Sequence, residues 1–288
     1  MPATVRIGTC SWADEGLLKA WYPRGVSTAE KRLRYYAERF DTVEVDSPFY
    51  ALPNPDVTRR WAERTPDAFT FHVKASAAMT LHEGEPTDQA FREFRAAFEP
   101  LELSGKLRSV LLQYHPRFVK SDEAKTELAR ASARLAPLVP LIEFRHRSWM
   151  EPSERADTLR FLESHGLAYV SVDSPATRAS NVSPRVSAAT HRVAYVRFHG
   201  RNVETWNIRG ARSAADRFDW MYAPEELAEW VEPVRKLAAQ AEEVYALFNN
   251  NRDDFAPRSA VSFRGLLDAA GVPATGGIEP PPTELTLF

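Results

Sequence analysis

Short runs of bulky apolar residues recur along the chain, and apolar and polar positions alternate within each run. Side chains alternate across a β-strand, so this pattern predicts strands with one apolar and one polar face. The polar positions become charged or strongly polar towards the C-terminal end of each run. The expected strands are Val5–Cys10, Thr42–Asp46, Phe69–Lys74, Val110–His115, Leu141–Arg145, Tyr169–Asp173, Tyr195–His199 and Val244–Asn249.

The segments between these runs carry helical patterns, several of them with capping residues. Asn54 followed by Pro55, for example, is a favourable N-cap and first helical position. Strands that alternate with helices are expected to run parallel. The expected helices are Thr28–Arg39, Pro55–Arg64, Thr87–Leu103, Ser121–Leu135, Pro152–His165, Pro224–Glu242 and Asp254–Ala270.

Eight such strands in α/β alternation predict a single (β/α)8 TIM-like barrel over residues 1–271. A Pro- and Gly-rich tail follows over residues 272–288. An open doubly wound sheet is the rival, but its central strands are apolar on both faces, whereas these strands keep a polar face. Long irregular loops are expected after the sixth and seventh strands, at Ser174–Arg192 and Arg201–Ala223. Active sites of barrels lie on that face.

Alternation also predicts which polar side chains share a face. Glu44 pairs with Asp46, and Glu143 pairs with Arg145. In a barrel these faces point into the lumen, and the outermost side chains lie at its mouth. The candidate site comprises Asp46, Lys74, Glu143, Arg145, Asp173, Arg197, His199 and Asn249.

Composition narrows the function classes. Hydrophobic content of 44% and charged content of 26% in 288 residues are those of an ordinary globular protein. The net charge of −2 predicts no strong overall attraction to nucleic acid or an anionic membrane. The single cysteine, Cys10, excludes an intramolecular disulfide framework and a cysteine-rich zinc site. With no apolar run of membrane-spanning length and no signal peptide, we expect a cytoplasmic protein without a membrane partner.

Several motifs in order resemble the YecE-like family, the domain of unknown function 72. They cover nearly the whole chain and are Gly8-Thr-Cys-Ser-Trp12, Trp21-Tyr-Pro23, Phe40-Asp-Thr-Val-Glu-Val-Asp-Ser-Pro-Phe-Tyr50, Leu52-Pro53, Lys74-Ala75, Glu143-Phe-Arg-His-Arg-Ser-Trp149, Tyr195-Val-Arg-Phe-His-Gly200 and Phe248-Asn-Asn250. The resemblance implies a TIM-barrel-like fold. It implies no reaction, because the family has no settled activity.

The chemistry of the residues suggests roles within the site. We expect Glu143, Asp173 and His199 to be catalytic, as groups that activate water. Lysine and arginine side chains suit phosphate or carboxylate groups, and aromatic rings can stack on a sugar or base. The expected ligand-binding residues are Trp12, Asp46, Tyr50, Lys74, Arg145, Arg197 and Asn249. The alternative is that the charged residues form buried salt bridges and that the aromatic residues pack the loops.

A divalent metal is a further alternative. The lumen offers the carboxylates of Glu44, Asp46, Glu143 and Asp173 to such an ion. The expected cations Lys74, Arg145 and Arg197 nearly balance these charges, which favours a metal-free network. A Schiff-base role for Lys74 and a glycosidase that uses Glu44 and Glu143 are other readings of the same residues.

The sequence thus predicts a protein that binds an anionic, hydroxyl-rich ligand, such as a nucleotide, a nucleic-acid fragment or a sugar phosphate. Phosphoester hydrolysis linked to DNA metabolism is the first reaction considered. The alternative is a non-catalytic binding module that its tail recruits. The last five residues resemble the peptide that binds bacterial sliding clamps, with matches at Leu285, Leu287 and Phe288. The other reading of this tail is that it docks on the barrel.

Overall fold

A closed barrel of parallel strands forms the centre of the molecule. The computed structural model describes residues 2–177, 179–182, 184–207 and 214–279. Each strand pairs with its neighbour in chain order, and β1 pairs with both β8 and β2. The strands are β1 (Val5–Thr9), β2 (Thr42–Val45), β3 (Thr70–Lys74), β4 (Leu107–Gln113), β5 (Val139–Glu143), β6 (Ala168–Asp173), β7 (Val193–Phe198) and β8 (Glu243–Phe248).

The pairings of β1 with β8 and with β2 close the barrel, and on the β2 side Thr9 lies opposite Val43. A Cβ atom on Gly8 would lie 2.5 Å from the carbonyl oxygen of Thr42. Any larger residue at position 8 would therefore push these two strands apart. The glycine allows the close approach that completes the ring.

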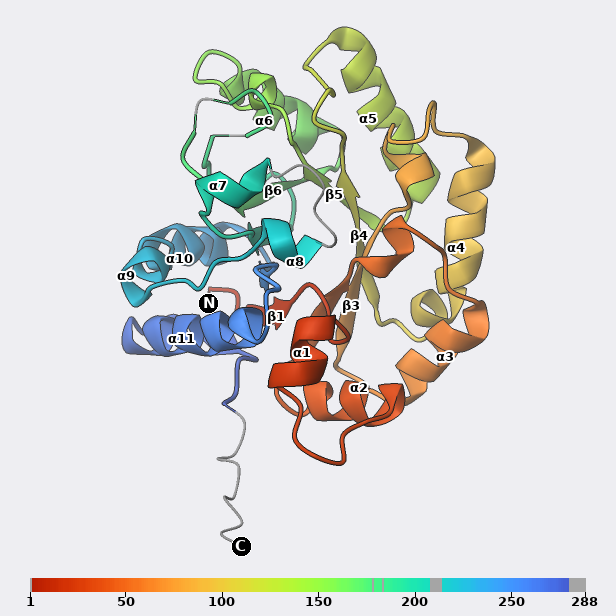
Figure 1. Ribbon diagram of the computed structural model, residues 1–288. Coiled ribbons are helices and arrows are strands. Elements are labelled where there is room, and N and C mark those ends of the chain that lie inside the picture. The colour runs from red at the N-terminus through yellow and green to blue at the C-terminus, as the bar shows by residue number, and fades with distance from the viewer. Residues whose placement is uncertain (1, 178, 183, 208–213, 280–288) are drawn as a thin grey trace, which may run out of the picture.

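The helices surround the strands, as Figure 1 shows. The longer ones match the expected segments, with ends that differ by a few residues. They are α2 (Ala29–Ala37), α3 (Pro55–Glu63), α4 (Asp88–Leu103), α5 (Asp122–Leu135), α6 (Arg155–Ser164) and α11 (Phe255–Ala269). The other helices are α1 (Glu15–Ala20), α7 (Val203–Trp206), α8 (Ala214–Arg217), α9 (Pro224–Ala228) and α10 (Val231–Gln240).

The structure corrects the expected helix over residues 224–242. It is two helices, α9 and α10, with Glu229 and Trp230 between them. The indole Nε1 of Trp230 donates to Asp173 at 2.6 Å, so the break anchors this segment to the end of β6. The expected loops after β6 and β7 are present. Residues 174–192 hold no helix or strand among those described, and in the described part of the second loop the helices are the short α7 and α8.

The chain remains in contact with the barrel beyond residue 271. β9 (Ala274–Thr275) pairs in parallel with the beginning of β1, opposite Val5 and Arg6. The backbone N–H of Ile278 then donates to the carbonyl of Arg39. Because Val5 begins β1, this segment lies at the N-terminal ends of the barrel strands. The described part of the expected tail therefore packs on the barrel instead of leaving it at residue 272.

Apolar side chains fill much of the lumen and leave its C-terminal end for polar residues. One buried cluster contains Leu111, Leu141, Val170, Val172 and Leu247, which come from β4, β5, β6 and β8. A larger cluster packs the outer faces of the strands against the helices. None of the described helices combines the length and the apolarity needed to cross a bilayer.

Candidate functional site

Arg197 lies at the centre of the polar end of the lumen, between two carboxylates. Its Nη1 donates to Oε2 of Glu143 at 2.6 Å, and its Nη2 donates to Oε1 of Glu44 at 2.5 Å. Nη2 also lies 3.3 Å from Oδ2 of Asp46. The side chains of Arg197, Glu44 and Glu143 are 0% exposed. The guanidinium is therefore already occupied by carboxylates, and the expected phosphate contact would have to displace them.

Glu143 collects most of the remaining hydrogen bonds. Its Oε1 accepts from Nε2 of Gln113 at 2.7 Å and from Nη1 of Arg145 at 3.3 Å. Burial alone would raise the pKa of Glu143, but Arg197, His199 and Arg145 outweigh it and hold this pKa well below its usual range. Glu143 is therefore an ionised carboxylate enclosed by donors.

His199 is held in its neutral form. Burial lowers its pKa to about 4, although Glu143 opposes this shift. Nε2 lies 3.0 Å from Oε1 of Glu143, and an ionised carboxylate can only accept, so we assign the ring proton to Nε2. Nδ1 then accepts from Nδ2 of Asn249 at 2.9 Å. Both ring nitrogens are engaged, which suits a side chain that fixes Glu143 and Asn249 in place.

Glu44 differs from Glu143 in its protonation. Burial raises the pKa of Glu44 to about 7; Arg197 opposes the shift and Asp46 adds to it. The hydroxyl of Tyr195 donates to its Oε2 at 2.8 Å. The two buried carboxyls on Arg197 therefore have pKa values on opposite sides of their usual range.

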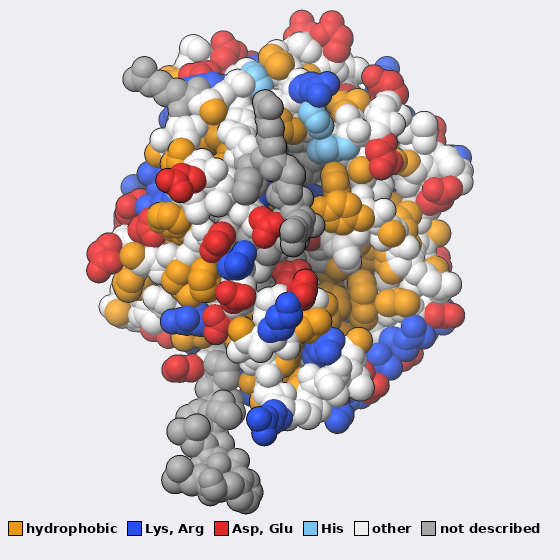
Figure 2. Space-filling model, viewed as in Figure 1, with side chains coloured by type: hydrophobic (Ala, Val, Ile, Leu, Met, Phe, Trp, Pro, Cys, Tyr) orange, Lys and Arg blue, Asp and Glu red, His pale blue; other side chains and the backbone are white. Residues whose placement is uncertain are grey.

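The barrel mouth above this network opens into a cavity of about 1230 Å³. In Figure 2 hydrophobic, histidine and charged side chains border the hollowed part of this face. Glu143, Arg197 and His199 lie beneath the cavity and are not among its lining residues. The expected site residues that do line it are Trp12, Asp46, Tyr50, Lys74, Arg145 and Asn249.

Lys74, at the end of β3, has an unusual position in this cavity. Among the described residues no carboxylate lies within ion-pair distance of its ammonium group, and Nζ lies 4.5 Å from the centroid of the Phe49 ring. Burial lowers the pKa of Lys74, and the carboxylates of Asp46 and Glu143 only partly restore it. The cavity therefore contains a desolvated cation without a direct anionic partner.

Arg145 provides a second cation close to the same floor. Its side chain is 11% exposed, and its guanidinium lies 4.7 Å from the centroid of the Trp206 ring. Nη1 contacts Glu143, whereas Nε is buried and has no hydrogen-bond partner within the described part of the chain. Arg145 thus retains donors that the network does not use.

The aromatic residues of the cavity divide into buried and exposed ones. Trp12 is 6% exposed and packs edge to face on Trp61, with ring centroids 5.1 Å apart. Tyr50 is 81% exposed and contacts Phe49 at its edge. Trp12 therefore forms part of a wall, and Tyr50 presents a free ring at the rim.

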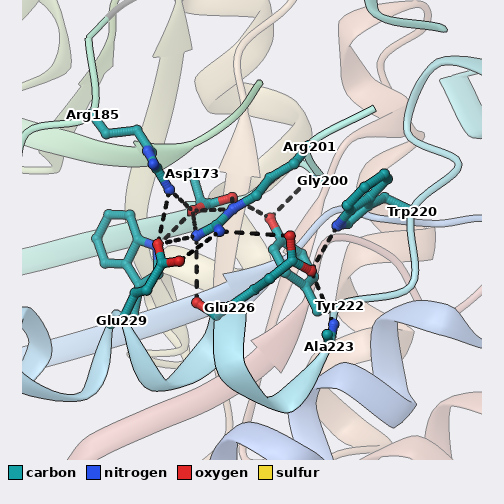
Figure 3. A network of polar contacts seen from close by, with 10 residues as sticks. Asp173, Arg185, Gly200, Arg201, Trp220, Tyr222, Ala223, Glu226 and Glu229 are labelled. Atoms are coloured by element: carbon teal, nitrogen blue, oxygen red, sulfur yellow. Dashed lines mark hydrogen bonds and ion pairs between the residues drawn. The ribbon is translucent and has the colours of Figure 1, made fainter. Parts of the chain in front are cut away.

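Asp173 does not face the lumen, which corrects the expectation from strand parity. Register places Val172 opposite Arg197 and places Asp173 opposite Phe198 on the outer face of the barrel. Figure 3 shows the carboxylate surrounded by donors from the two long loops and from the α9 region. It accepts from Arg201 at 2.8 Å, from the Tyr222 hydroxyl at 2.7 Å and from Trp230 at 2.6 Å.

Sequence reasoning missed two cavity residues, Asp14 and Asn251. Both line the cavity from loops, the first after β1 and the second after β8. Neither lies in a strand, so alternation could not identify them. The available signal was their position, since each closely follows an expected strand end on the face where barrel sites form.

The donor set at the mouth also bears on metal binding. In the described ranges no group of three or more His, Cys, Asp or Glu side chains is placed to hold a metal ion. The guanidinium of Arg197 bridges Glu44 and Glu143, where a cation would otherwise be required. These carboxylates are thus neutralised by protein groups in the structure described.

Comparison with known proteins agrees with the fold. Residues 6–284 match the model of DUF72, a protein of unknown function. UPF0759 protein YunF of Bacillus subtilis (strain 168) is 31% identical over 271 residues, which are 92% of this chain and 95% of YunF. UPF0759 protein YecE of Escherichia coli (strain K12) is 35% identical over 87 residues, 30% of this chain and 32% of YecE.

Solved structures extend the similarity to three dimensions. A DUF72 family protein of Thermotoga maritima aligns with a TM-score of 0.81 and 30% identity, over 92% of this chain and 99% of the other. A DUF72 family protein of Enterococcus faecalis aligns with a TM-score of 0.81 and 25% identity, over 92% and 96% of the two chains. Sequence motifs, barrel and comparisons agree, and this chain belongs to the DUF72 family.

Proposed function

We propose that this protein binds a small anionic, hydroxyl-bearing ligand, such as a sugar phosphate or a nucleotide, in the cavity at the barrel mouth. Lys74 and Arg145 hold the anionic group. The observation that carries the proposal is the half-buried side chain of Lys74 in the cavity, whose ammonium has no carboxylate at ion-pair distance among the described residues.

The physical reason is the cost of desolvating a charge. A buried ammonium is unfavourable unless an anion or hydrogen-bond acceptors compensate it. An anion that enters the cavity meets Lys74 as a point charge and the free Nε–H of Arg145 as a directional donor. Asp46 is already paired with Arg197, so it competes only weakly for Lys74.

Calorimetric titration with sugar phosphates and nucleotides tests the proposal. Lys74→Met should weaken the tightest interaction about tenfold or more, because it removes the charge that receives the anion. Lys19→Met is the matched control, since Lys19 also lines the cavity but is exposed and pairs with Glu15. Equal affinities of wild type and Lys74→Met would refute the assignment of Lys74.

Phosphoester hydrolysis is a second candidate function, because the cavity also holds a carboxyl group that can exchange its proton near neutral pH. Burial raises the pKa of Asp14 to about 6, and hydrogen bonds from Ser11 and Asn251 moderate the shift. The residues first expected to activate water, Glu143, Asp173 and His199, are buried in hydrogen-bond networks. Binding therefore has the stronger support.

Turnover separates the two functions. Phosphodiester and sugar-phosphate libraries are incubated with wild type, Asp14→Asn and Glu143→Gln, with and without Mg²⁺ or Mn²⁺. Release of product by wild type that Asp14→Asn reduces at least tenfold would support hydrolysis. If all three proteins are inert while a ligand still binds, the protein is a binding module.

We also propose that the last residues bind a sliding clamp, which would associate the protein with DNA. Leu285, Leu287 and Phe288, on which this rests, lie outside the described residues. The support is the match of the final peptide to the clamp-binding motif. The full chain and its Phe288→Ala variant are compared for binding to a purified clamp, and equal binding would remove the idea.

A further inference from the structure

The loop after β1 and the loop after β8 meet at the edge of the cavity. Gly16 lies in the first turn of α1, directly after the loop that follows β1. A Cβ atom on Gly16 would lie 2.6 Å from the backbone nitrogen of Asp253, so the backbones of the two segments are in direct contact. β1 and β8 are neighbours in the barrel, which brings the loops together. This contact brings together Asp14, two residues before Gly16, and Asn251, two residues before Asp253.

Asp14 and Asn251 form a polar group with Ser11. The side chains of Ser11 and Asn251 lie near the carboxyl group of Asp14 and lower its pKa, against the effect of burial. The Ser11 hydroxyl oxygen also accepts from the backbone N–H of Ala13 at 3.0 Å. All three side chains line the cavity. We call this group the Asp14 cluster.

The Asp14 cluster keeps hydrogen-bond acceptors that the protein does not use. No lysine or arginine lies within ion-pair distance of the Asp14 carboxylate in the described part of the chain. Oδ1 of Asn251 is buried and has no hydrogen-bond partner there. Asp14 is the N-cap of α1, but its side chain makes no capping hydrogen bond. The acceptor atoms of this cluster are therefore not explained by the stability of α1.

The cavity thus has two poles of opposite character. Lys74 and Arg145 present donors and positive charge from the ends of β3 and β5. The Asp14 cluster presents carboxylate and amide oxygens, which accept hydrogen bonds from hydroxyl groups. Trp12 lies between Ser11 and Asp14 in the chain and adds an apolar surface that can pack against a sugar ring.

We propose that the Asp14 cluster is a hydroxyl-recognition subsite and that the ligand is a phosphorylated sugar, with its phosphate at Lys74 and Arg145. This inference rests on the proposed function and narrows it. A lone anion would leave the acceptor oxygens of the Asp14 cluster without a hydroxyl donor from the ligand, which is unfavourable in a desolvated site. A sugar phosphate satisfies both poles with a single molecule.

The test compares the affinities of the full-length protein for inorganic phosphate, a nucleoside monophosphate and a panel of pentose and hexose phosphates. Wild type should bind the best sugar phosphate at least about tenfold more tightly than inorganic phosphate. Asp14→Ala and Asn251→Ala should each reduce this preference, with affinity for inorganic phosphate within about twofold of wild type. Glu15→Gln is the control, because Glu15 is exposed and pairs with Lys19.

The outcomes are distinguishable. Unchanged thermal unfolding of Asp14→Ala, with the preference lost, supports a subsite in place of a structural role. If inorganic phosphate binds as tightly as every sugar phosphate, or if Asp14→Ala keeps the preference, the subsite is wrong and the anion site stands. If the nucleotide binds as tightly as the best sugar phosphate, the identification of the ligand as a sugar phosphate is wrong. If none of the probes binds to wild type, the proposed function fails with it.

Discussion

Glu143 and Asp173 each end a strand of the barrel, and both side chains are fully buried, yet they face in opposite directions. Glu143 points into the lumen and contacts Arg197, His199 and Gln113. Asp173 points outwards and contacts donors from the long loops and the α9–α10 segment. We refer to these as the lumen network and the outer network.

The comparison separates groups whose hydrogen-bonding capacity is used within the protein from groups whose capacity is not used. Both carboxylates accept several hydrogen bonds, which is how a buried charge becomes tolerable. The outer network holds loops against the barrel, and the lumen network supports the cavity floor. The groups with unused capacity, Lys74 and Asp14, lie in the cavity instead. The carboxylates whose hydrogen bonds are supplied by the protein stabilise the fold. A ligand is expected at the groups that still lack a partner.

The largest effect is expected from Arg197→Met. It leaves Glu44 and Glu143 buried without their shared cation, and the free energy of unfolding should fall by about 3–5 kcal/mol. Urea denaturation at pH 7 measures the change. Arg192→Met is the control, because Arg192 is 46% exposed and its ion pairs should contribute less than about 1 kcal/mol. Equal losses in the two variants would show that the lumen network is not a buried support.

The next prediction concerns how the free energy of unfolding depends on pH. The folded-state pKa of Glu44 is raised from 4.5 to about 7, so its contribution to stability is present below pH 4.5 and is lost as pH rises to 7. Glu44→Gln does not titrate there, so its stability relative to wild type should increase by about 1 kcal/mol per pH unit between pH 5 and 7. Urea denaturation at intervals of one pH unit measures this slope.

Glu143→Gln is the matched variant for that slope. The pKa of Glu143 is lowered in the folded state, so wild-type stability from this group is present above pH 4.5 and is lost as pH falls below it. The relative stability of Glu143→Gln should therefore change only in the acid range and in the opposite sense. A flat profile for both variants would remove the distinction between the two carboxyls.

A smaller effect is expected from Asp173→Asn in the outer network. The change removes the charge opposite Arg201, which keeps Glu229 as a partner at 2.9 Å. The free energy of unfolding should fall by about 2 kcal/mol, with ligand affinity unchanged. Denaturation and calorimetric titration are measured on the same variant. Loss of binding without loss of stability would place Asp173 in the site after all.

The smallest effect is expected from Tyr222→Phe. The Tyr222 hydroxyl donates to Asp173 and accepts from the backbone N–H of Gly200 at 2.8 Å. Removing it should lower the free energy of unfolding by about 1 kcal/mol. Tyr50→Phe should change stability by less than about 0.5 kcal/mol, because the side chain of Tyr50 is 81% exposed. The urea concentrations at the midpoints of unfolding of the two variants are compared to measure this difference.

Alternation of apolar and polar positions was sufficient to predict the barrel and most of the lumen. Tyr195 and Arg197, for example, lie on the inner face of β7 as their spacing requires. The rule works because the lumen is enclosed on all sides, so polar residues on that face must form a network with one another. The cavity residues Lys74 and Arg145 follow from the same parity.

The same rule misplaced Asp173, and the reason is physical. In β6 the lumen face carries Val170 and Val172, and the outer face carries Ser171 and Asp173. Arg-, Tyr- and Trp-bearing segments cover that outer face, so a carboxylate is satisfied there. A polar strand face shows that partners exist, but it does not show on which side they lie. Asp14 and Asn251 were missed because loops have no periodicity.

The seam between β1 and β8 joins the first and last β/α units of the chain, and the Asp14 cluster is assembled across it. During synthesis Asp14 leaves the ribosome long before Asn251. The cavity can therefore reach its full form only when the eighth strand has been made and has closed the ring. A ligand that bridges the two poles would stabilise the closed barrel and not the incomplete chain. Ligand binding would then act late, as a check on complete folding.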